Sequence, residues 1–326
     1  MVYKIMLSEI PIIVLTGGPC AGKTTALATI KRYFEDLGFN VILVPEAATT
    51  VLEMGFSLRE FDALERERFQ KGVLKVIFGL EDTAMDLAKV KAKSIIICDR
   101  GALDGAAFCE QDGWNRVMEG KTIEELLGRY SGVIHMVTAA DGAEEYYTLE
   151  NNKVRNGSGA EAIVADKKLQ KIWSMHHNFK IVNNYGTFAD KMKNVIKEIS
   201  GFVGLPKIEK KHSYSVFVNR EIVGNKHTVE FGSLPGGNML ISRNYGTHIS
   251  YYLKHVNSGN WETQRLIDSL EYKSLSSSII DRKTVENIVW VENNVVFTLN
   301  KTESILEYYA EEEIQIDGIK KTFLLV

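Results

Sequence analysis

The sequence predicts an α/β domain built on a five-stranded parallel sheet, followed by a second domain of antiparallel β-strands. Up to about residue 200, short apolar runs alternate with long helical patterns, which is typical of βαβ units. From residue 212 onward the runs are short and β-like, and turns rich in Gly, Pro and Asn separate them. We therefore expect a first domain over residues 1–204, a linker over 205–211 and a β-rich domain over 212–326.

Five apolar runs predict the strands of the first domain. Strands of a parallel sheet are buried on both faces, so they are continuous in apolar residues. The expected strands are Ile12–Leu15, Val41–Val44, Ile95–Cys98, Val133–Val137 and Lys180–Val182. Between them, capping-box patterns at Ser57 and Thr122 predict two helix starts, because each hydroxyl is followed three residues later by a glutamate.

The second domain is expected to be a barrel or a curved antiparallel sheet. Asp317-Gly318 lies between Glu313–Ile316 and Lys320–Val326, a pattern that predicts a two-residue hairpin. The other expected strands are Tyr214–Val218, Met239–Ser242, His248–Leu253, Val295–Leu299 and Ile305–Tyr309.

Composition excludes several classes of protein. The chain has 326 residues, 45% of them hydrophobic and 25% charged, with a net charge of −3, so no nucleic-acid partner is expected. No apolar run approaches the roughly 18 residues of a transmembrane segment, and the N-terminus lacks a signal-peptide pattern. Three cysteines without metal-ligand spacing indicate a reducing compartment. The expected location is cytoplasmic.

Residues 17–24, Gly-Gly-Pro-Cys-Ala-Gly-Lys-Thr, match the P-loop (Walker A) pattern that binds nucleotide phosphates. Gly17 and Gly22 let the backbone turn its amides toward a phosphate. Lys23 supplies a compact charge to the β- and γ-phosphates, and Thr24 supplies a hydroxyl to Mg²⁺. An apolar strand precedes this loop and a helical pattern follows it, as the site requires. The alternative is a glycine-rich turn without a ligand.

The expected phosphate cradle covers nine consecutive residues: Gly17, Gly18, Pro19, Cys20, Ala21, Gly22, Lys23, Thr24 and Thr25. Cys20 is expected to be a small loop residue, with redox sensing as the alternative. The expected ligand is a purine nucleoside triphosphate, GTP or ATP, with Mg²⁺.

Three charged residues at strand ends are candidates for chemistry. Asp99 ends the third expected strand, where a Walker B carboxylate holds Mg²⁺; the alternative is a turn or a helix cap. Arg100 follows it, as a clamp on phosphate or substrate. Glu46 follows the second strand and is a candidate general base; the alternative is a loop carboxylate or a helix cap.

Two further segments are weaker candidates for nucleotide contacts. Residues 141–161 are polar and rich in glycine, and Arg155 among them is a candidate lid residue that contacts the phosphates. A simple solvated loop is the alternative. Asn183 ends the fifth strand and is a candidate for contact with the base.

Several motifs in order resemble the TRPL translocation defect family. They are Gly17 to Thr24, Pro45 to Ala48, Asp99 to Asp104 with Ala107-Phe108, and Thr138 to Glu144 with Tyr146-Tyr147. The resemblance covers residues 10–200. It implies a GTP-binding P-loop domain similar to ribosylnicotinamide kinase, a CYTH-like (triphosphate tunnel) barrel, phosphoinositide binding and a role in membrane-protein trafficking.

Three interpretations remain open from the sequence. The first is a regulatory GTP- or ATP-binding protein, cytoplasmic and peripheral at membranes, whose barrel contacts a phosphoinositide lipid or membrane-protein cargo. The second is a nucleoside-type kinase with Glu46 as base and Arg100 as clamp. Residues 212–326 carry 11 Lys and Arg against 14 Asp and Glu, so lipid binding would need a local pocket, and a protein-interaction module is a third possibility.

Overall fold

A computed structural model describes residues 9–58, 61–147, 158–206, 210–256 and 262–325. They divide into two compact units. The α/β unit comprises residues 9–23 and 40–202, and the β-rich unit comprises residues 24–39 and 203–325. Helix α1 (Lys23–Asp36) follows the P-loop and, from its second residue on, belongs to the β-rich unit.

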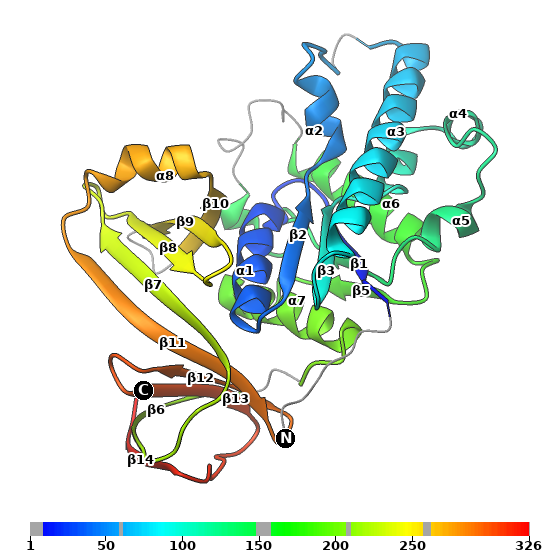
Figure 1. The fold of residues 1–326 in the computed structure, drawn as a ribbon. Coiled ribbons are helices and arrows are strands. Elements are labelled where there is room, and N and C mark those ends of the chain that lie inside the picture. The colour runs from blue at the N-terminus through cyan, green and yellow to red at the C-terminus, as the bar shows by residue number, and fades with distance from the viewer. Residues whose placement is uncertain (1–8, 59–60, 148–157, 207–209, 257–261, 326) are drawn as a thin grey trace. The chain divides into compact units, whose positions relative to one another are not determined.

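A five-stranded parallel sheet forms the centre of the α/β unit (Figure 1). Its strands are β1 (Ile12–Thr16), β2 (Asn40–Val44), β3 (Ser94–Asp99), β4 (Gly132–Met136) and β5 (Phe179–Val182). The spatial order is β2-β3-β1-β4-β5, so β1 lies at the centre and pairs with β3 and β4. All five strands were predicted to within one residue at each end, because each is rich in apolar residues and the inner strands β1, β3 and β4 are buried almost throughout.

Helices connect these strands. They are α2 (Ala47–Leu52), α3 (Ala63–Ala88), α4 (Gln111–Val117), α5 (Ile123–Leu127), α6 (Gly159–Trp173) and α7 (Phe188–Phe202), with short 3₁₀ helices η1 (Asp104–Phe108) and η2 (Glu144–Tyr146). The capping box at Thr122 is confirmed. The capping box predicted at Ser57 includes residues 59–60, which lie outside the described residues. Helix α3 begins at Ala63, where Asp62 and Glu65 form a capping box.

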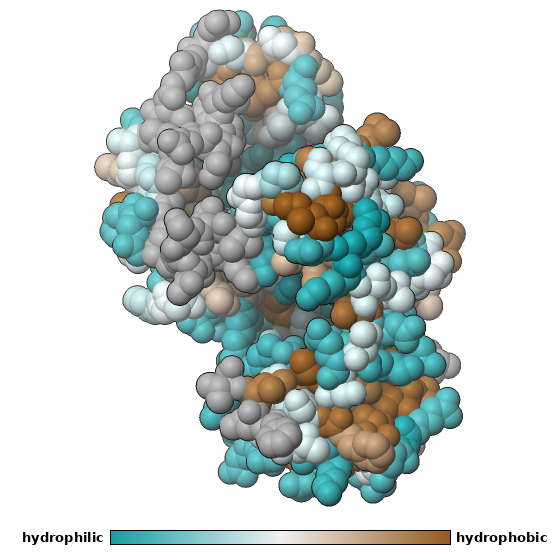
Figure 2. Space-filling view, turned by 90° about the vertical axis from the view of Figure 1, so that its left-hand side faces the viewer, coloured by the Kyte–Doolittle hydropathy of each residue, from teal (hydrophilic) through white to brown (hydrophobic). Residues whose placement is uncertain are grey.

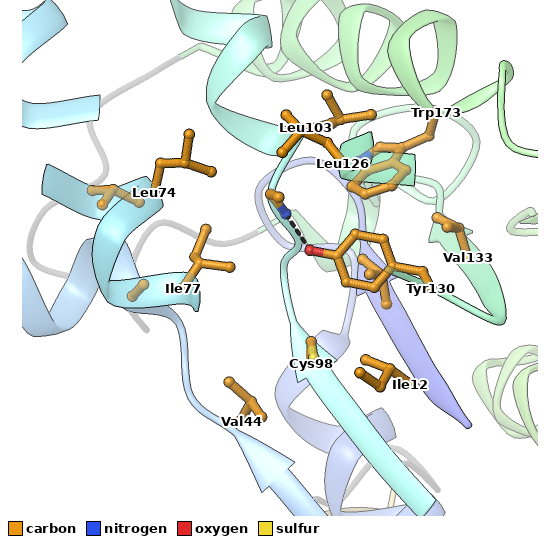
Figure 3. Close-up of a cluster of buried hydrophobic side chains, with 14 of the residues drawn as sticks. Ile12, Val44, Leu74, Ile77, Cys98, Leu103, Leu126, Tyr130, Val133 and Trp173 are labelled. Carbon is orange, nitrogen blue, oxygen red and sulfur yellow. Dashed lines mark hydrogen bonds between the residues drawn. The ribbon is translucent and has the colours of Figure 1, made fainter. Parts of the chain in front are cut away.

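The core of the α/β unit joins strands to helices (Figure 3). Val44 and Cys98 from the sheet, Ile77 from α3 and Trp173 from α6 belong to one buried cluster. The ring of Tyr130 packs edge-on against Trp173, with ring centroids 5.6 Å apart. This packing places the carboxyl ends of β1, β3 and β4, where the candidate residues lie, on a rigid support.

The β-rich unit contains one nine-stranded antiparallel sheet and a short helix. The strands are β6 (Lys210–Val218), β7 (Asn225–Ser233), β8 (Met239–Asn244), β9 (Ile249–Val256), β10 (Glu262–Ile267), β11 (Arg282–Glu292), β12 (Val295–Asn300), β13 (Ile305–Ala310) and β14 (Ile319–Leu324), and the helix is α8 (Ser269–Ser276). Their order is β10-β9-β8-β7-β11-β12-β13-β6-β14. The antiparallel sheet was predicted correctly.

Of the two expected forms, a barrel or a curved sheet, the described residues show a sheet that does not close. In the described part of the chain the two outer strands, β10 and β14, pair only with β9 and β6, so the sheet is open. The two-residue turn predicted at Asp317-Gly318 is present, with the Ile319 amide donating to the carbonyl of Ile316 at 3.1 Å, but the pairing around it stops at this single bridge, and β14 pairs with β6. Long strands β7 and β11 join the two ends of the sheet (Figure 1). Each end has its own apolar cluster, which explains how the sheet is stable without closure.

Helix α1 brings two carboxylates to the sheet of the β-rich unit. Asp36 accepts hydrogen bonds from Arg243 at 2.9 Å and from the Tyr245 hydroxyl at 2.9 Å. Glu35, only 3% exposed, accepts one from the Ser250 hydroxyl at 2.8 Å. These contacts fix the end of α1 on β8 and β9, since buried carboxylates require such partners.

Among the helices that the structure describes, none has the length and apolar character of a bilayer span. On the face shown in Figure 2, apolar groups form separate patches among hydrophilic ones rather than a continuous belt.

Candidate nucleotide site

The backbone of the P-loop has a shape that glycine alone tolerates at two positions. Gly17 has a φ of 143°, and a Cβ there would lie 2.1 Å from the carbonyl oxygen of Met136. Gly22 has a φ of 86°, and its Cβ would lie 2.8 Å from the ring of Phe188. Cys20, with a φ of 56°, is also left-handed. Consecutive turns of this kind point amides to one side of a loop, as a phosphate cradle needs.

The end of strand β4 holds the loop from one side. The Thr138 hydroxyl donates to the carbonyl of Pro19 at 2.5 Å, and the amide of Ala139 donates to the carbonyl of Cys20 at 3.3 Å. Ala21 is buried, at 2% exposed. The loop is therefore part of the packed structure and already shaped before any ligand arrives.

The side chain of Lys23 lies against the loop itself. It is 7% exposed, and its Nζ donates to the carbonyls of Gly17 at 3.2 Å and Gly18 at 3.4 Å. Thr24, which is exposed, and Thr25 follow in the first turn of α1. The ammonium group is thus held at the loop that the sequence identified as the phosphate site.

Asp99, at the end of β3, has an oxygen that needs a ligand. Its Oδ1 is buried and has no hydrogen-bond partner among the described residues. Burial raises the pKa of this carboxyl, Lys23 opposes the shift, and Glu46 adds to it. A buried carboxylate oxygen without a donor is costly, and a hydrated Mg²⁺ would satisfy it. The residue therefore fits the predicted metal-holding role.

Arg100 joins two carboxylates at the same edge of the sheet. Its Nε donates to Glu46 at 2.5 Å and its Nη1 to Asp104 at 3.1 Å. Burial alone would raise the pKa of Glu46, but Arg100, Thr49 and Lys23 together lower it to about 2. Glu46 is therefore an ionised partner of Arg100 at neutral pH. As a base it is weak unless it leaves this ion pair.

Asp104 is a buried hub that the sequence did not reveal. It accepts hydrogen bonds from the Thr16 hydroxyl at 2.8 Å and from the Trp173 indole at 2.6 Å, besides that of Arg100. The hub thus links the end of β1, the turn after β3 and helix α6. Tyr130 supports the same turn by accepting the amide hydrogen of Ala102 at 2.7 Å (Figure 3). These contacts fix the turn that carries Asp99 and Arg100.

A family model described as an AAA domain matches residues 12–191, more than half of the chain. The chain belongs to this AAA domain family. The matched region is a P-loop NTPase-type domain, which indicates nucleotide binding, and it contains the loop, Glu46, Asp99 and Arg100. No curated protein matches the chain.

Within the AAA domain, the structure brings the main predicted residues together. Lys23 and Arg100 lie close enough to Glu46 and Asp99 for their charges to lower the pKa values of both carboxyls, against the rise that burial causes. Arg155 lies outside the described residues.

Asn183 closes a local turn by accepting the amide hydrogen of Tyr185 at 3.1 Å. Its neighbour Asn184 instead reaches the loop after β4, donating to the carbonyls of Thr138 at 2.8 Å and Asp141 at 2.7 Å. Contact between Asn183 and a base therefore stays a prediction. Of the proposed lid segment, only the ends are described.

Lys191 is a buried cation in the AAA domain that the sequence analysis missed. It is 3% exposed and donates to the carbonyl of Val137 at 2.7 Å and to Asn184 at 2.6 Å. Burial lowers its pKa to about 8, and the charge of Asp166 opposes that shift. The sequence held one indication of this burial: Lys191 stands next to Met192, which belongs to the apolar stripe of α7.

Proposed function

We propose that the AAA domain binds a purine nucleoside triphosphate with Mg²⁺, hydrolyses it slowly and serves a regulatory role. The observation that carries this proposal is the preformed loop, in which Gly17 and Gly22 take conformations unsuited to any other residue. The orphaned oxygen of Asp99 adds to it. Both features favour a bound anion and its metal over a ligand-free turn.

The roles of the residues follow from their chemistry. The amides of the loop donate to phosphate oxygens, and the ammonium of Lys23 balances the charge of the β- and γ-phosphates. Thr24 and Asp99 would hold Mg²⁺, which neutralises charge on the phosphates when bound. In the described part of the chain no three His, Cys, Asp or Glu side chains gather as a metal site of their own, in keeping with a metal that arrives with the nucleotide.

Calorimetry tests the proposal. The parent protein should bind Mg²⁺·GTP or Mg²⁺·ATP, and Lys23→Ala should weaken binding by roughly 10²-fold or more. Lys89→Ala, which removes an exposed lysine that follows α3, is the matched control and should bind as the parent does. Equal binding by Lys23→Ala and the parent would refute the site. The comparison of the two nucleotides decides between GTP, which the family resemblance favours, and ATP.

We also propose that residues 1–204 and 212–326 act as separate functional domains, with the second binding a phosphoinositide or protein cargo. The support is the resemblance to the TRPL translocation defect family. Such binding cannot rest on the arginines of residues 212–326, since all four are paired with carboxylates: Arg220 with Glu292, Arg243 with Asp36, Arg265 with Glu271 and Arg282 with Glu230. Exposed lysines such as Lys283 and Lys320 would have to carry it.

Flotation with liposomes tests the lipid half of this proposal. Vesicles that contain phosphoinositides should recover the protein, and Lys283→Ala with Lys320→Ala should lower the recovery. Equal recovery on neutral vesicles would contradict phosphoinositide binding and leave cargo binding as the role of these strands.

A nucleoside-type kinase is the second candidate, favoured by the cluster of Glu46, Asp99 and Arg100 at the edge of the sheet. The lowered pKa of Glu46 weakens its role as base, so Arg100 would act mainly by orienting phosphate or substrate. The test is transfer of the γ-phosphate to a panel of nucleosides. A fall of roughly 10²-fold in Glu46→Gln would support Glu46 as base, and no transfer by the parent would exclude this candidate.

A further inference from the structure

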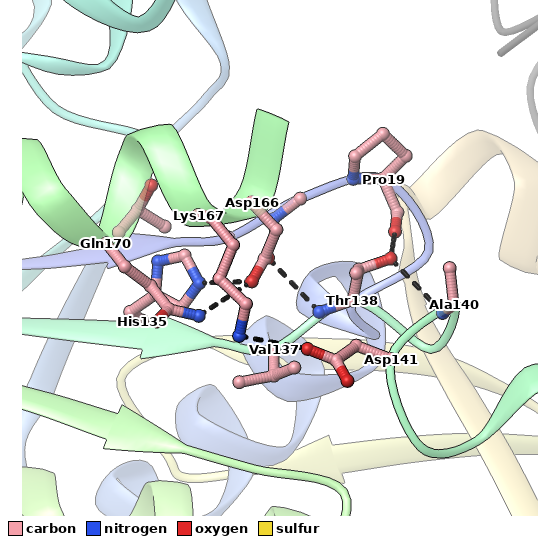
Figure 4. A network of polar contacts seen from close by, with 12 residues as sticks. Pro19, His135, Val137, Thr138, Ala140, Asp141, Asp166, Lys167 and Gln170 are labelled. Atoms are coloured by element: carbon pink, nitrogen blue, oxygen red, sulfur yellow. Dashed lines mark hydrogen bonds and ion pairs between the residues drawn. The ribbon is translucent and has the colours of Figure 1, made fainter. Parts of the chain in front are cut away.

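Asp166, on helix α6, is a buried carboxylate beneath the P-loop that the proposed function does not use (Figure 4). The residue is fully buried, at 0% exposed. Its Oδ1 accepts the amide hydrogens of Gly18 at 2.7 Å and of Thr138 at 3.1 Å. Its Oδ2 accepts from Gln170 at 2.8 Å and lies 3.0 Å from Nε2 of His135. One carboxylate therefore joins the P-loop, the end of β4 and helix α6.

The carboxylate is ionised at neutral pH although it is buried. Burial alone would raise the pKa of Asp166, but His135, the Gly18 amide and Gln170 lower it below its ordinary value. Hydrogen bonds to a charged acceptor are stronger than those between neutral groups. The bond from the Gly18 amide is thus among the firmest that hold the loop.

This contact also explains the glycine at position 18. A Cβ on Gly18 would lie 2.8 Å from Oδ1 of Asp166, so a larger residue would push the carboxylate away. The amide of Gly18 points at Asp166 and is not available to a phosphate. The two parts of the loop therefore have different roles: the amide of Gly18 anchors the loop to Asp166, and the amides of the residues that follow are left to contact a phosphate.

We propose that Asp166 is a positioning residue that keeps the P-loop in its anion-binding shape before nucleotide arrives. The proposal rests on the proposed nucleotide-binding function and deepens it. Without the carboxylate, the Gly18 amide would lose its buried acceptor. The nucleotide would then have to order the loop as it binds, which would weaken its affinity. Asp166 does not touch the ligand and acts through the backbone of the loop.

The test compares two substitutions that differ in one hydrogen bond. Asp166→Asn keeps an acceptor oxygen for the amides of Gly18 and Thr138, whereas Asp166→Ala removes it. We expect Asp166→Ala to weaken Mg²⁺·nucleotide binding by about 10- to 100-fold, and Asp166→Asn to bind within about 3-fold of the parent. Gln170→Ala removes a partner of Oδ2 but leaves the bond to Gly18, so it controls for general damage to α6 and should bind as the parent does.

Hydrogen exchange gives a second readout that requires no ligand. In the absence of nucleotide, the amides of Gly17, Gly18 and Cys20 to Gly22 should exchange about 10-fold faster in Asp166→Ala than in the parent, and near the parental rate in Asp166→Asn and Gln170→Ala. If the parent binds no nucleotide but exchange behaves so, Asp166 still positions the loop and the proposed function is wrong. The positioning role is overturned if Asp166→Ala has the exchange rates and the nucleotide affinity of the parent. It is also overturned if Gln170→Ala speeds exchange and weakens nucleotide binding as much as Asp166→Ala does.

Discussion

The buried Lys191 makes the stability of the α/β unit depend on pH in a predictable way. Its pKa is about 8 in the folded protein, against an ordinary value of 10.5. The folded state releases this proton near pH 8, whereas the unfolded chain keeps it up to about pH 10.5. Between these values the unfolded state binds more protons, so the free energy of unfolding rises with pH.

The magnitude follows from the two pKa values. Each pH unit between them adds about 1.4 kcal/mol, and the whole interval adds about 3 kcal/mol. Lys191→Met abolishes the titration. The stability of the parent relative to Lys191→Met should therefore be flat below pH 8 and increase by about 2 kcal/mol by pH 9.5. Raised tyrosine pKa values act in the opposite direction above pH 10, so the comparison ends before that point.

Urea unfolding followed by tryptophan fluorescence measures this difference, because the buried Trp114 and Trp173 report on the α/β unit. Signals from the β-rich unit are common to both proteins and cancel in the difference. Lys197→Met, which replaces an exposed lysine on the same helix, is the control and should follow the parent at every pH. A difference between the parent and Lys191→Met that stays constant from pH 7 to 9.5 would refute the reasoning.

Three other changes test the remaining contacts. Glu46→Gln should lower the free energy of unfolding by up to about 3 kcal/mol at pH 7, measured by urea unfolding. The loss should shrink as pH falls from 4.5 toward 2, because over this range the carboxyl is protonated in the unfolded chain before it is protonated in the folded state, which removes the gain from its lowered pKa. A double-mutant cycle on Asp36 and Arg243 should give a coupling of about 1–3 kcal/mol; additive losses would contradict the ion pair. Gly17→Ala should cost about 2 kcal/mol or more in thermal unfolding and abolish nucleotide binding, because its methyl group would strike the carbonyl of Met136; a stable variant that binds nucleotide would argue against the strained loop.

The parallel sheet could be predicted from the sequence because its physics is local. The inner strands β1, β3 and β4 are buried almost throughout, and burial leaves an unbroken apolar run. The outer strands β2 and β5 are only partly buried but are still rich in apolar residues. The P-loop was equally visible, since glycines, a lysine and a threonine must stand at fixed spacing. The long strands β7 and β11 were missed because each has one exposed face and carries many polar residues.

The sequence does not show which strands pair at the ends of the second sheet or which residues form the buried polar network, because both depend on contacts between residues far apart in the chain. The turn signal at Asp317-Gly318 was real, but β14 found its partner in β6, about a hundred residues earlier. Asp166 contacts Gly18 although the two residues are 148 positions apart in the sequence. The sequence held one indication of this contact. Asp166 stands on the same face of α6 as the buried Leu169 and Trp173, and a buried charge requires polar partners.

A crystal structure with Mg²⁺ and a non-hydrolysable nucleoside triphosphate tests the central claim most directly. We expect the terminal phosphate oxygens to lie about 2.7–3.2 Å from the amides of Gly22, Lys23 and Thr24, with the metal near Thr24 and Asp99. A nucleotide bound elsewhere, with this loop empty and Asp99 still without a ligand, would contradict the account.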